Sequence, residues 1–160
     1  ARTARISPGQ NGALHRAVHH AVAGDILVVD GGGSKRFGPF GDLLADGCVA
    51  KGMVGAVVDC TIRVSAEINA LGFQVFCRGF HPEATAKTDR GETDAPVVLG
   101  GVQVHPSDIV VGDDDGVVVI PIEAAPEVLT KVAAVAAREE SIRARIHAGE
   151  TTLDIFELDP

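Results

Sequence analysis

Residues 24–79 constrain the fold of this chain more than any other stretch. They read GDILVVDGGGSKRFGPFGDLLADGCVAKGMVGAVVDCTIRVSAEINALGFQVFCRG. Two continuous apolar runs, residues 26–30 and 54–59, are separated by glycine turns and a helix-compatible stretch. Continuous apolar runs are typical of strands that are covered on both faces of a sheet. Their alternation with helices predicts an α/β fold.

The length and charge of the chain limit its function. A chain of 160 residues with 46% hydrophobic residues can form one compact domain with a proper core. The formal net charge is −8. A basic face is needed to contact nucleic-acid phosphates or anionic lipids, so this charge argues against direct nucleic-acid binding and against membrane binding.

The cysteines indicate a reducing compartment. The three cysteines, Cys48, Cys60 and Cys77, are widely spaced and include no CxxC pair. We interpret them as buried free thiols of a cytoplasmic protein. The first residues, ARTARISPGQ, lack the apolar core of a signal peptide, and no apolar run reaches transmembrane length.

The remaining pattern predicts layers of mixed secondary structure. We expect a polar surface loop over residues 81–94, and a tail after residue 150 that packs on a neighbouring molecule. The predicted strands cover residues 1–6, 26–29, 54–58, 73–77, 97–99, 102–104, 109–111 and 117–120, and the predicted helices cover residues 12–23, 42–51, 65–70 and 123–147. Strands that alternate with helices and then form an antiparallel section predict a mixed, layered α/β domain.

Gly31-Gly32-Gly33-Ser34 follows the first covered strand and suggests a phosphate loop. A dinucleotide fingerprint would require glycine where Arg36 stands, and no Lys-Ser/Thr pair of a P-loop follows. These departures disfavour nucleotide binding without removing it, and two further interpretations stay open. One is a tight turn with positive φ, and the other is close approach of the backbone to a small ligand.

Gly41-Asp42-Leu43-Leu44 stands where a loop enters a helix. The free backbone N–H groups at such a place favour an anion. Asp42 can equally be a first-turn acid that interacts with the helix dipole.

Arg63 follows the second covered strand, at the end where α/β sheets place ligands. Its guanidinium could hold a carboxylate through two parallel hydrogen bonds. The alternative is a surface arginine that pairs with Glu67 one turn later. The sequence context favours the ligand.

Asp113-Asp114-Asp115-Gly116 looks like a metal loop, but VVVIP follows where a calcium loop would need further oxygen ligands. An Asp-Gly pair between two apolar strands predicts a hairpin turn. The six histidines show no ligand spacing.

In chain order, the motifs VVDGGGS, FGDLLA, GAVVDCTIR with SAE, FCRG, PVVLGGVQVHPSD and DDDGVVVIP resemble the RraA-like family. That family includes divalent-metal (class II) aldolases acting on 4-hydroxy-4-methyl-2-oxoglutarate, often with oxaloacetate decarboxylase activity, and protein regulators of ribonuclease E. Older descriptions name such chains demethylmenaquinone methyltransferases, yet nothing here looks like a methyl-donor site. The resemblance covers residues 2 to about 155, without the helical segment that usually precedes the first strand.

The resemblance implies one swivelling-domain-like β/β/α domain over residues 1–160, assembled as a trimeric ring with sites between subunits. It also implies a Mg²⁺ or Mn²⁺ cofactor and pyruvate-type substrates. The family's carboxylate-binding arginine falls on Arg63, and the acid that acts through metal-bound water falls on Asp42, so the resemblance implies these two as the catalytic residues. The loop amides fall on Gly41, Asp42, Leu43 and Leu44, and an acid from the neighbour's last helix falls on Glu139 or Glu140.

The chain departs from the family at Val64, where the aldolases carry the aspartate that ligates the metal. Cleavage beside a ketone produces an enolate, whose charge needs a metal or a lysine Schiff base, and valine supplies no ligand. Lys35 stands in the glycine loop and could in principle act as the amine. Three hypotheses follow: a 2-oxo-acid-binding protein that cleaves 4-hydroxy-4-methyl-2-oxoglutarate or decarboxylates oxaloacetate, a non-catalytic regulator that binds a ribonuclease or another protein, and a degenerate oligomer with neither role.

Overall fold

The computed structural model describes residues 1–159 as two compact units, the first formed by Ala1–Ile122 and the second beginning at Glu123. The first unit contains every strand, in the order β1 (Arg2–Arg5), α1 (Gly12–His20), β2 (Ile26–Asp30), α2 (Asp42–Ala50), β3 (Gly55–Val58), α3 (Ser65–Ala70), β4 (Gln74–Cys77), β5 (Glu92–Thr93), β6 (Val97–Leu99), β7 (Val102–Val104), β8 (Ile109–Asp113) and β9 (Gly116–Ile120). The 3₁₀ turn η1 (Ile122–Ala124) leads to α4 (Ala125–His147) and α5 (Thr152–Phe156) in the second unit.

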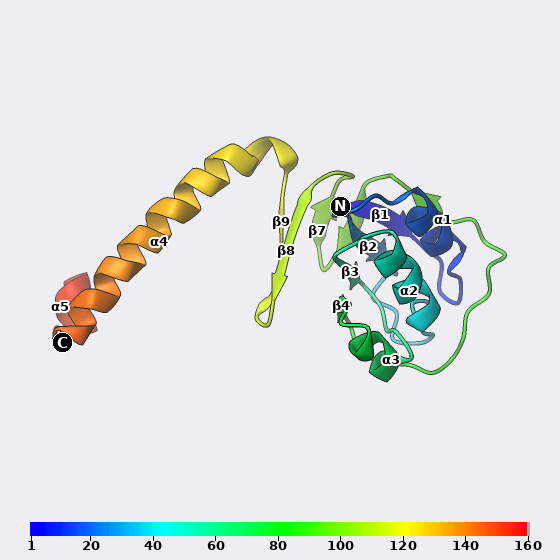
Figure 1. The fold of residues 1–160 in the computed structure, drawn as a ribbon, viewed down its shortest axis with the longest axis horizontal. Helices are drawn as coiled ribbons and strands as arrows, with labels where there is room; N and C mark the ends of the chain where they lie inside the picture. Colours follow the sequence, from blue (N-terminus) through cyan, green and yellow to red (C-terminus); the bar gives the residue numbers. More distant parts are fainter. Residues whose placement is uncertain (160) are drawn as a thin grey trace. The chain divides into compact units, whose positions relative to one another are not determined.

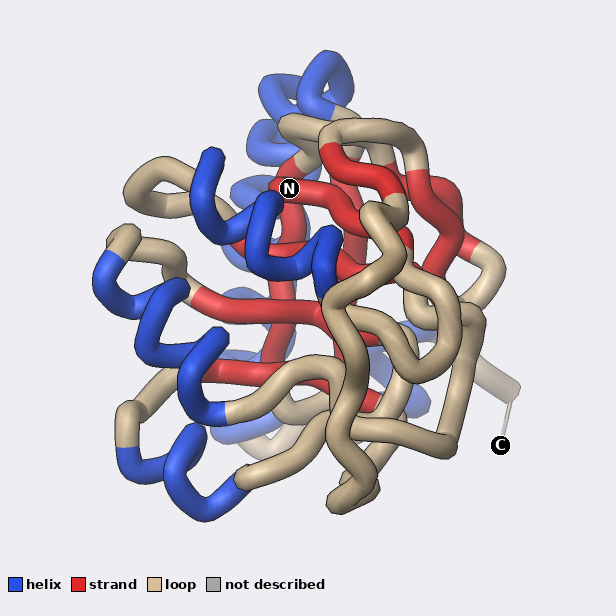
Figure 2. The backbone as a smooth tube through the Cα atoms, turned by 90° about the vertical axis from the view of Figure 1, so that its right-hand side faces the viewer, coloured by secondary structure: helices blue, strands red, loops and turns tan. Residues whose placement is uncertain are grey.

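The main sheet of the first unit has the strand order β4-β3-β2-β1-β5. Strands β1 to β4 are parallel and β5 is antiparallel to β1, which confirms the predicted mixed α/β class. Helices α1, α2 and α3 connect successive parallel strands and lie together on one face of this sheet (Figures 1 and 2). Each crossover therefore returns the chain to the same end of the sheet.

Alternating side chains of β2 explain the layers. Leu27 and Val29 belong to the large core beneath the helices, whereas Val28 belongs to a smaller core with Val97 and Val104 of β6 and β7. The helices therefore cover one face of the sheet and the β6–β7 hairpin covers the other, as the continuous apolar run predicts. This is the β/β/α layering that the resemblance implied.

Apart from shifts of one or two residues at element ends, two predictions for the first unit were wrong. The helix expected over residues 12–23 ends at His20, because the Val22 amide donates to the Asp25 carboxylate at 3.0 Å and turns the chain away from the helix. Val22 is consequently exposed rather than buried in the core. The expected loop over residues 81–94 contains β5, which pairs with β1 at Ala4 and Arg5.

The second unit contains α4 and α5 and has no buried residue in its described part. The predicted helix over residues 123–147 is present as η1 followed by α4. The tail contains a helix that the sequence reading missed, α5, which begins with a capping box between Thr151 and Asp154. That residues 1–160 form one domain remains a prediction.

Candidate functional site

The carboxyl ends of the parallel strands bring the two predicted ligand-binding segments together. The loop after β2 ends at Gly41, where α2 begins, and the loop after β3 carries Arg63 just before α3. The Arg63 amide donates to the Phe40 carbonyl oxygen at 3.0 Å, so the two loops are joined through their backbones. Ligands of α/β sheets commonly bind at this end.

The side chain of Arg63 lies along two glycines of the β2–α2 loop. Its Nε donates to the Gly38 carbonyl oxygen at 3.1 Å. A Cβ atom on Gly38 would stand 2.7 Å from Arg63 Cβ, and one on Gly41 would stand 3.3 Å from Arg63 Cγ. These glycines therefore leave the space in which the arginine stem lies.

The guanidinium retains binding capacity. Among the described residues Arg63 forms no ion pair, so the expected alternative of a pair with Glu67 is not seen. The Nη1 and Nη2 groups have no hydrogen-bond acceptor in the described part of the chain. A half-buried guanidinium whose two Nη groups have no partner can donate two parallel hydrogen bonds to one carboxylate.

The N-terminus of α2 adds unpaired donors beside Arg63. The amides of Gly41, Asp42 and Leu43 donate to no group of residues 1–159, as expected for a first helical turn. The Leu44 amide differs, because it donates to the Gly41 carbonyl oxygen at 3.1 Å and its side chain is buried in the core. The predicted set of amides thus reduces from residues 41–44 to residues 41–43.

The two first side chains of α2 point to different environments. Asp42 is half-buried, and its carboxylate has no hydrogen-bond or ion-pair partner among the described residues. Leu43 is 77% exposed. The acid is therefore placed as a first-turn residue that favours the helix dipole, and it also remains available to a ligand.

Val64 has an unusual backbone. Its φ of 57° and ψ of 42° place a β-branched residue in the left-handed helical region, at the N-cap of α3 and without a side-chain cap. This region is unfavourable for β-branched residues and is tolerated best by Gly, Asn and Asp. The fold thus keeps, immediately after Arg63, a conformation that suits an aspartate better than a valine.

The three glycines of residues 31–33 are explained by backbone geometry and close packing. Gly32 and Gly33 have φ of 64° and 68°, and a Cβ on Gly31 would stand 2.7 Å from the Cys60 sulfur. The tight turn and the close approach of the β3–α3 loop therefore account for all three residues. Lys35, the candidate for a Schiff base, is exposed, whereas such lysines are commonly desolvated.

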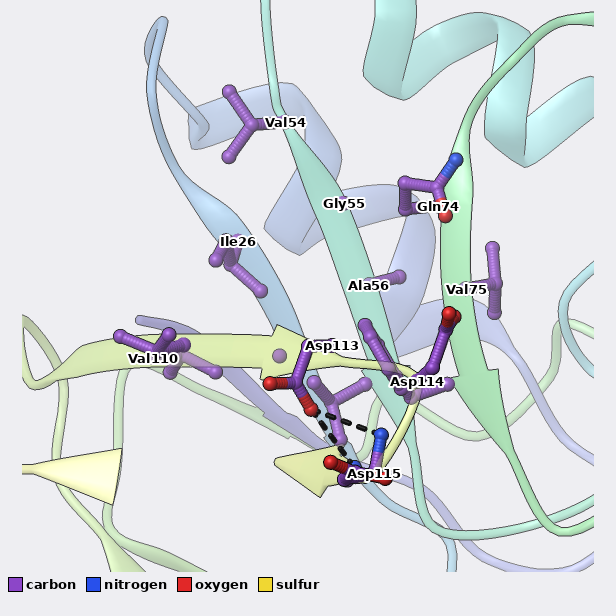
Figure 3. Close-up of a pocket in the computed structure, with 15 residues that line it drawn as sticks. Ile26, Val54, Gly55, Ala56, Gln74, Val75, Val110, Asp113, Asp114 and Asp115 are labelled. Carbon is purple, nitrogen blue, oxygen red and sulfur yellow. Dashed lines mark hydrogen bonds between the residues drawn. The ribbon is translucent and has the colours of Figure 1, made fainter. Parts of the chain in front are cut away.

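The acidic run lies at the tip of the β8–β9 hairpin, as expected for a turn. Asp113 accepts hydrogen bonds from the amides of Asp115 and Gly116 at 2.9 and 3.2 Å (Figure 3). The turn residues are Asp114 and Asp115, since Asp113 pairs with Gly116. A cavity of about 680 Å³ lies between this tip and the edge formed by β3 and β4, and its lining is mainly apolar.

The cysteines are free. Burial raises the pKa of the Cys48 thiol to about 12. Burial, together with the nearby Asp59 carboxylate and Cys77, raises that of Cys60 to about 12. Cys77 is partly buried, so the expectation of buried thiols holds fully for two of the three. No helix of residues 1–159 combines the length and the apolar character that crossing a membrane requires.

Comparison with known proteins decides the family. The family model described as "RraA-like: Aldolase/RraA" matches residues 1–119. The chain belongs to the RraA-like family. This agrees with the order of sequence motifs and with the β/β/α layers.

Two curated relatives show how far the likeness extends. A putative 4-hydroxy-4-methyl-2-oxoglutarate aldolase of Halalkalibacterium halodurans is 40% identical over 121 residues, which is 76% of this RraA-like chain and 58% of the relative. The chain therefore spans 58% of the length of that relative. An uncharacterized protein of Methanocaldococcus jannaschii is 35% identical over 158 residues, which is 98% of this chain and 76% of the relative.

Solved structures share the fold. The RNA-processing inhibitor RraA from Thermus thermophilis is 32% identical, with a TM-score of 0.71, over 75% of this chain and 73% of that chain. Streptomyces coelicolor RraAS2, described as an unusual member of the RNase ES inhibitor RraA family, is 33% identical, with a TM-score of 0.78, over 89% and 73%.

The resemblance implies a divalent metal, but the donors of one copy of this chain do not fit one. Mg²⁺ requires several oxygen ligands in octahedral array. Asp42 offers one carboxylate, and the side chain of Val64 offers no donor. Among residues 1–159 no group of three or more His, Cys, Asp or Glu side chains could hold a metal ion.

Sequence reasoning missed the role of Gly38. Its carbonyl oxygen accepts the Arg63 Nε–H, and its missing side chain gives the arginine room. The repeated Phe-Gly spacing in FGPFGD was the available signal, but only the second glycine was singled out. Contacts between segments 25 residues apart in sequence cannot be read from either segment alone.

Proposed function

We propose that this RraA-like chain binds small 2-oxo acids at the edge formed by Arg63 and the N-terminus of α2. The observation that carries the proposal is the hydrogen bond from Arg63 Nε to the Gly38 carbonyl oxygen, which leaves both Nη groups for a ligand. The guanidinium lies against Gly41, the N-cap of α2.

The chemistry of the two donor groups supports a carboxylate. A guanidinium forms two parallel hydrogen bonds with the two oxygens of a carboxylate. The positive end of the α2 dipole and the unpaired amides of residues 41–43 favour a second oxygen function of the same small molecule. A 2-oxo acid carries its carboxylate and its ketone on adjacent carbons, so the two groups could meet these two donor sets.

Cleavage of 4-hydroxy-4-methyl-2-oxoglutarate to pyruvate, or decarboxylation of oxaloacetate, is the finer part of the proposal. The name of the Halalkalibacterium halodurans relative supports it. A divalent metal, where bound, would supply a Lewis acid for the enolate. Val64 and the few oxygen donors of one chain weigh against a metal site. We therefore assign ligand binding to Arg63 and give this residue no role in the cleavage step.

Two measurements test the proposal, one of ligand binding and one of substrate cleavage. Oxalate or pyruvate binding is followed by calorimetry, and pyruvate release from each substrate is measured with Mg²⁺, with Mn²⁺ and with a chelator. Saturable binding supports the oxo-acid site. Metal-dependent release above the rate of the free metal ion supports the enzyme reading, and release that equals the free-ion rate would contradict it.

Assembly with further copies of the chain is also proposed. The second unit buries no side chain in its described part, and α4 exposes Leu129, Val132, Val135 and Ile146. A helix of this kind gains most of its stability by packing an apolar face against another surface. We propose a trimer or a higher ring, with Glu139 or Glu140 of one copy near the site of the next. Light scattering at several concentrations tests it, and a monomer throughout would contradict it.

A second candidate function is regulation of a ribonuclease or another protein. The apolar side chain of Val64 where the aldolases have a metal ligand favours it. Two solved relatives are described as an RNA-processing inhibitor and as a member of an RNase inhibitor family. The net charge of −8 suits a basic partner. A pull-down with a ribonuclease E-like protein at low salt tests this function. If the ribonuclease does not retain this chain, the result counts against regulation. For either function the three free thiols support a cytoplasmic setting.

A further inference from the structure

We infer that His81 is a positioning residue for Arg63, acting through the Phe37–Gly38 peptide. The inference rests on the proposed function for its effect on ligand binding, but the positioning itself can be measured without ligand. His81 follows β4 and comes from a segment that neither the sequence motifs nor the candidate site includes.

His81 joins three loops. Its Nδ1 accepts hydrogen bonds from the backbone amides of Phe37 at 3.3 Å and of Glu83 at 3.2 Å. Its own amide donates to the Ile62 carbonyl oxygen at 2.9 Å, next to Arg63. The ring is therefore fixed between the loop after β2 and the loop after β3.

The Phe37–Gly38 peptide is held on several sides. The Thr61 hydroxyl donates to the Phe37 carbonyl oxygen at 2.6 Å, and the Gly38 amide donates to the Glu83 carbonyl oxygen at 2.8 Å. Phe37 has a φ of 75°, which is costly for a residue other than glycine. A strained residue keeps such a conformation only when its surroundings hold it there, and His81 supplies one of these ties.

The held peptide determines where Arg63 points. The Gly38 carbonyl oxygen accepts from Arg63 Nε at 3.1 Å, so the guanidinium plane takes its direction from this peptide. With Nε engaged, Nη1 and Nη2 form the face left for a carboxylate, which gives end-on binding. Release of Phe37 would let the Gly38 carbonyl rotate, and Arg63 would lose this direction.

The geometry also fixes the form of the imidazole. Nδ1 accepts both amides, so it carries no proton, and a neutral ring has its proton on Nε2. An asparagine can replace this function because its Oδ1 is bonded to Cγ, as Nδ1 is. A glutamine places its oxygen one bond further away, and a leucine offers no acceptor.

The test compares His81→Asn with His81→Gln and His81→Leu. The first readout is the ¹⁵N-Nε–H resonance of Arg63, assigned by its loss in Arg63→Lys. We expect a sharp, slowly exchanging signal in the parent and in His81→Asn, and a broadened or shifted signal in the other two variants. If His81→Leu does not fold, the Asn and Gln variants decide. An unchanged signal in Gln, or equal loss in Asn and Gln, would overturn the inference.

The second readout is oxalate affinity. Loss of one hydrogen bond that orients a donor is worth about fivefold in the dissociation constant, so we expect about fivefold weaker binding in Gln and Leu with recovery in Asn. If oxalate affinity across the His81 variants follows their thermal unfolding midpoints, and not the position of the hydrogen-bond acceptor, His81 has only a structural role. A parent protein that binds no oxalate while the Arg63 signal still follows the acceptor would reject the proposed function and retain the positioning role.

Discussion

The Nε–H of Arg63 donates to the carbonyl oxygen of Gly38 at 3.1 Å, so the loop after β2 directs an arginine that follows β3. The same two residues are in close contact, since a Cβ on Gly38 would stand 2.7 Å from Arg63 Cβ. The glycine therefore provides both the acceptor and the space.

Replacement of Arg63 tests the ligand site. Arg63→Ala should weaken oxalate or pyruvate binding by about 1.5–3 kcal/mol, because hydrogen bonds to a charged group are lost. Arg63→Lys should recover little, since an ammonium lacks the planar fork. Calorimetry measures both, with Arg90→Ala at an exposed arginine as the control. Unchanged affinity in Arg63→Ala would remove this residue from the site.

Gly38→Ala should disturb the same contact through crowding. The added methyl group would stand 2.6 Å from the His81 carbonyl oxygen, which belongs to the backbone. We expect a loss of about 1–3 kcal/mol in the free energy of unfolding, together with weaker oxo-acid binding. Gly47→Ala in α2 is the matched control, because its methyl group would stand 3.4 Å from the Val18 side chain of α1, which is close to an ordinary contact. A Gly38→Ala protein as stable as Gly47→Ala would contradict the packing argument.

The left-handed backbone of Val64 predicts a stabilising substitution. Val64→Asn should raise the free energy of unfolding by roughly 1 kcal/mol, because asparagine tolerates this conformation and valine does not. Urea unfolding measures the change. Val54→Asn provides the control for the change of residue type, since Val54 is an exposed valine outside the positive-φ residues, whereas Val64 is half-buried. Equal effects at both positions would show that polarity rather than strain is responsible.

Val64→Asp tests whether the chemistry can be restored. The variant adds a carboxylate beside Arg63 in a backbone conformation that suits aspartate, so we expect Mg²⁺-dependent pyruvate release from oxaloacetate above that of the parent. Val64→Asn separates relief of strain from the new charge. If a folded and oligomeric Val64→Asp protein releases no more pyruvate, the site differs from an aldolase at more than this residue.

The pKa of Cys48 predicts a loss of stability in alkali. Burial raises this pKa from 9.0 to about 12, so between these values the folded chain binds more protons than the unfolded chain. The free energy of unfolding contributed by this thiol is therefore complete below about pH 9 and falls as the pH rises toward 12.

Cys48→Ala should flatten that fall. Urea unfolding in reductant at several pH values from 8 upward measures it, and Cys77→Ala, which removes a partly exposed thiol, is the control. A slope unchanged in Cys48→Ala would show that other groups cause the alkaline loss.

The local sequence pattern was sufficient for most elements of the first unit. The strands at residues 97–99 and 102–104 and the helix at 65–70 have the predicted bounds, because apolar runs and glycine stops are local signals. The predicted end of α1 was wrong because the Asp25 side chain accepts the hydrogen bond of the Val22 amide. The two-residue strand β5 was missed because it exists only through pairing with β1.

For the candidate site, the sequence by itself determined the residue types: an arginine after one covered strand, a Gly-Asp turn after another, and a valine next to the arginine. Only the tertiary structure decided that Arg63 lies on Gly38 and Gly41, that the Leu44 amide is engaged, and that Val64 is held in a left-handed conformation. It also brought in His81, which has no sequence signal. The physical reason is that parallel strands bring loops from distant parts of the chain to one edge, where their contacts depend on backbone positions that no single segment specifies.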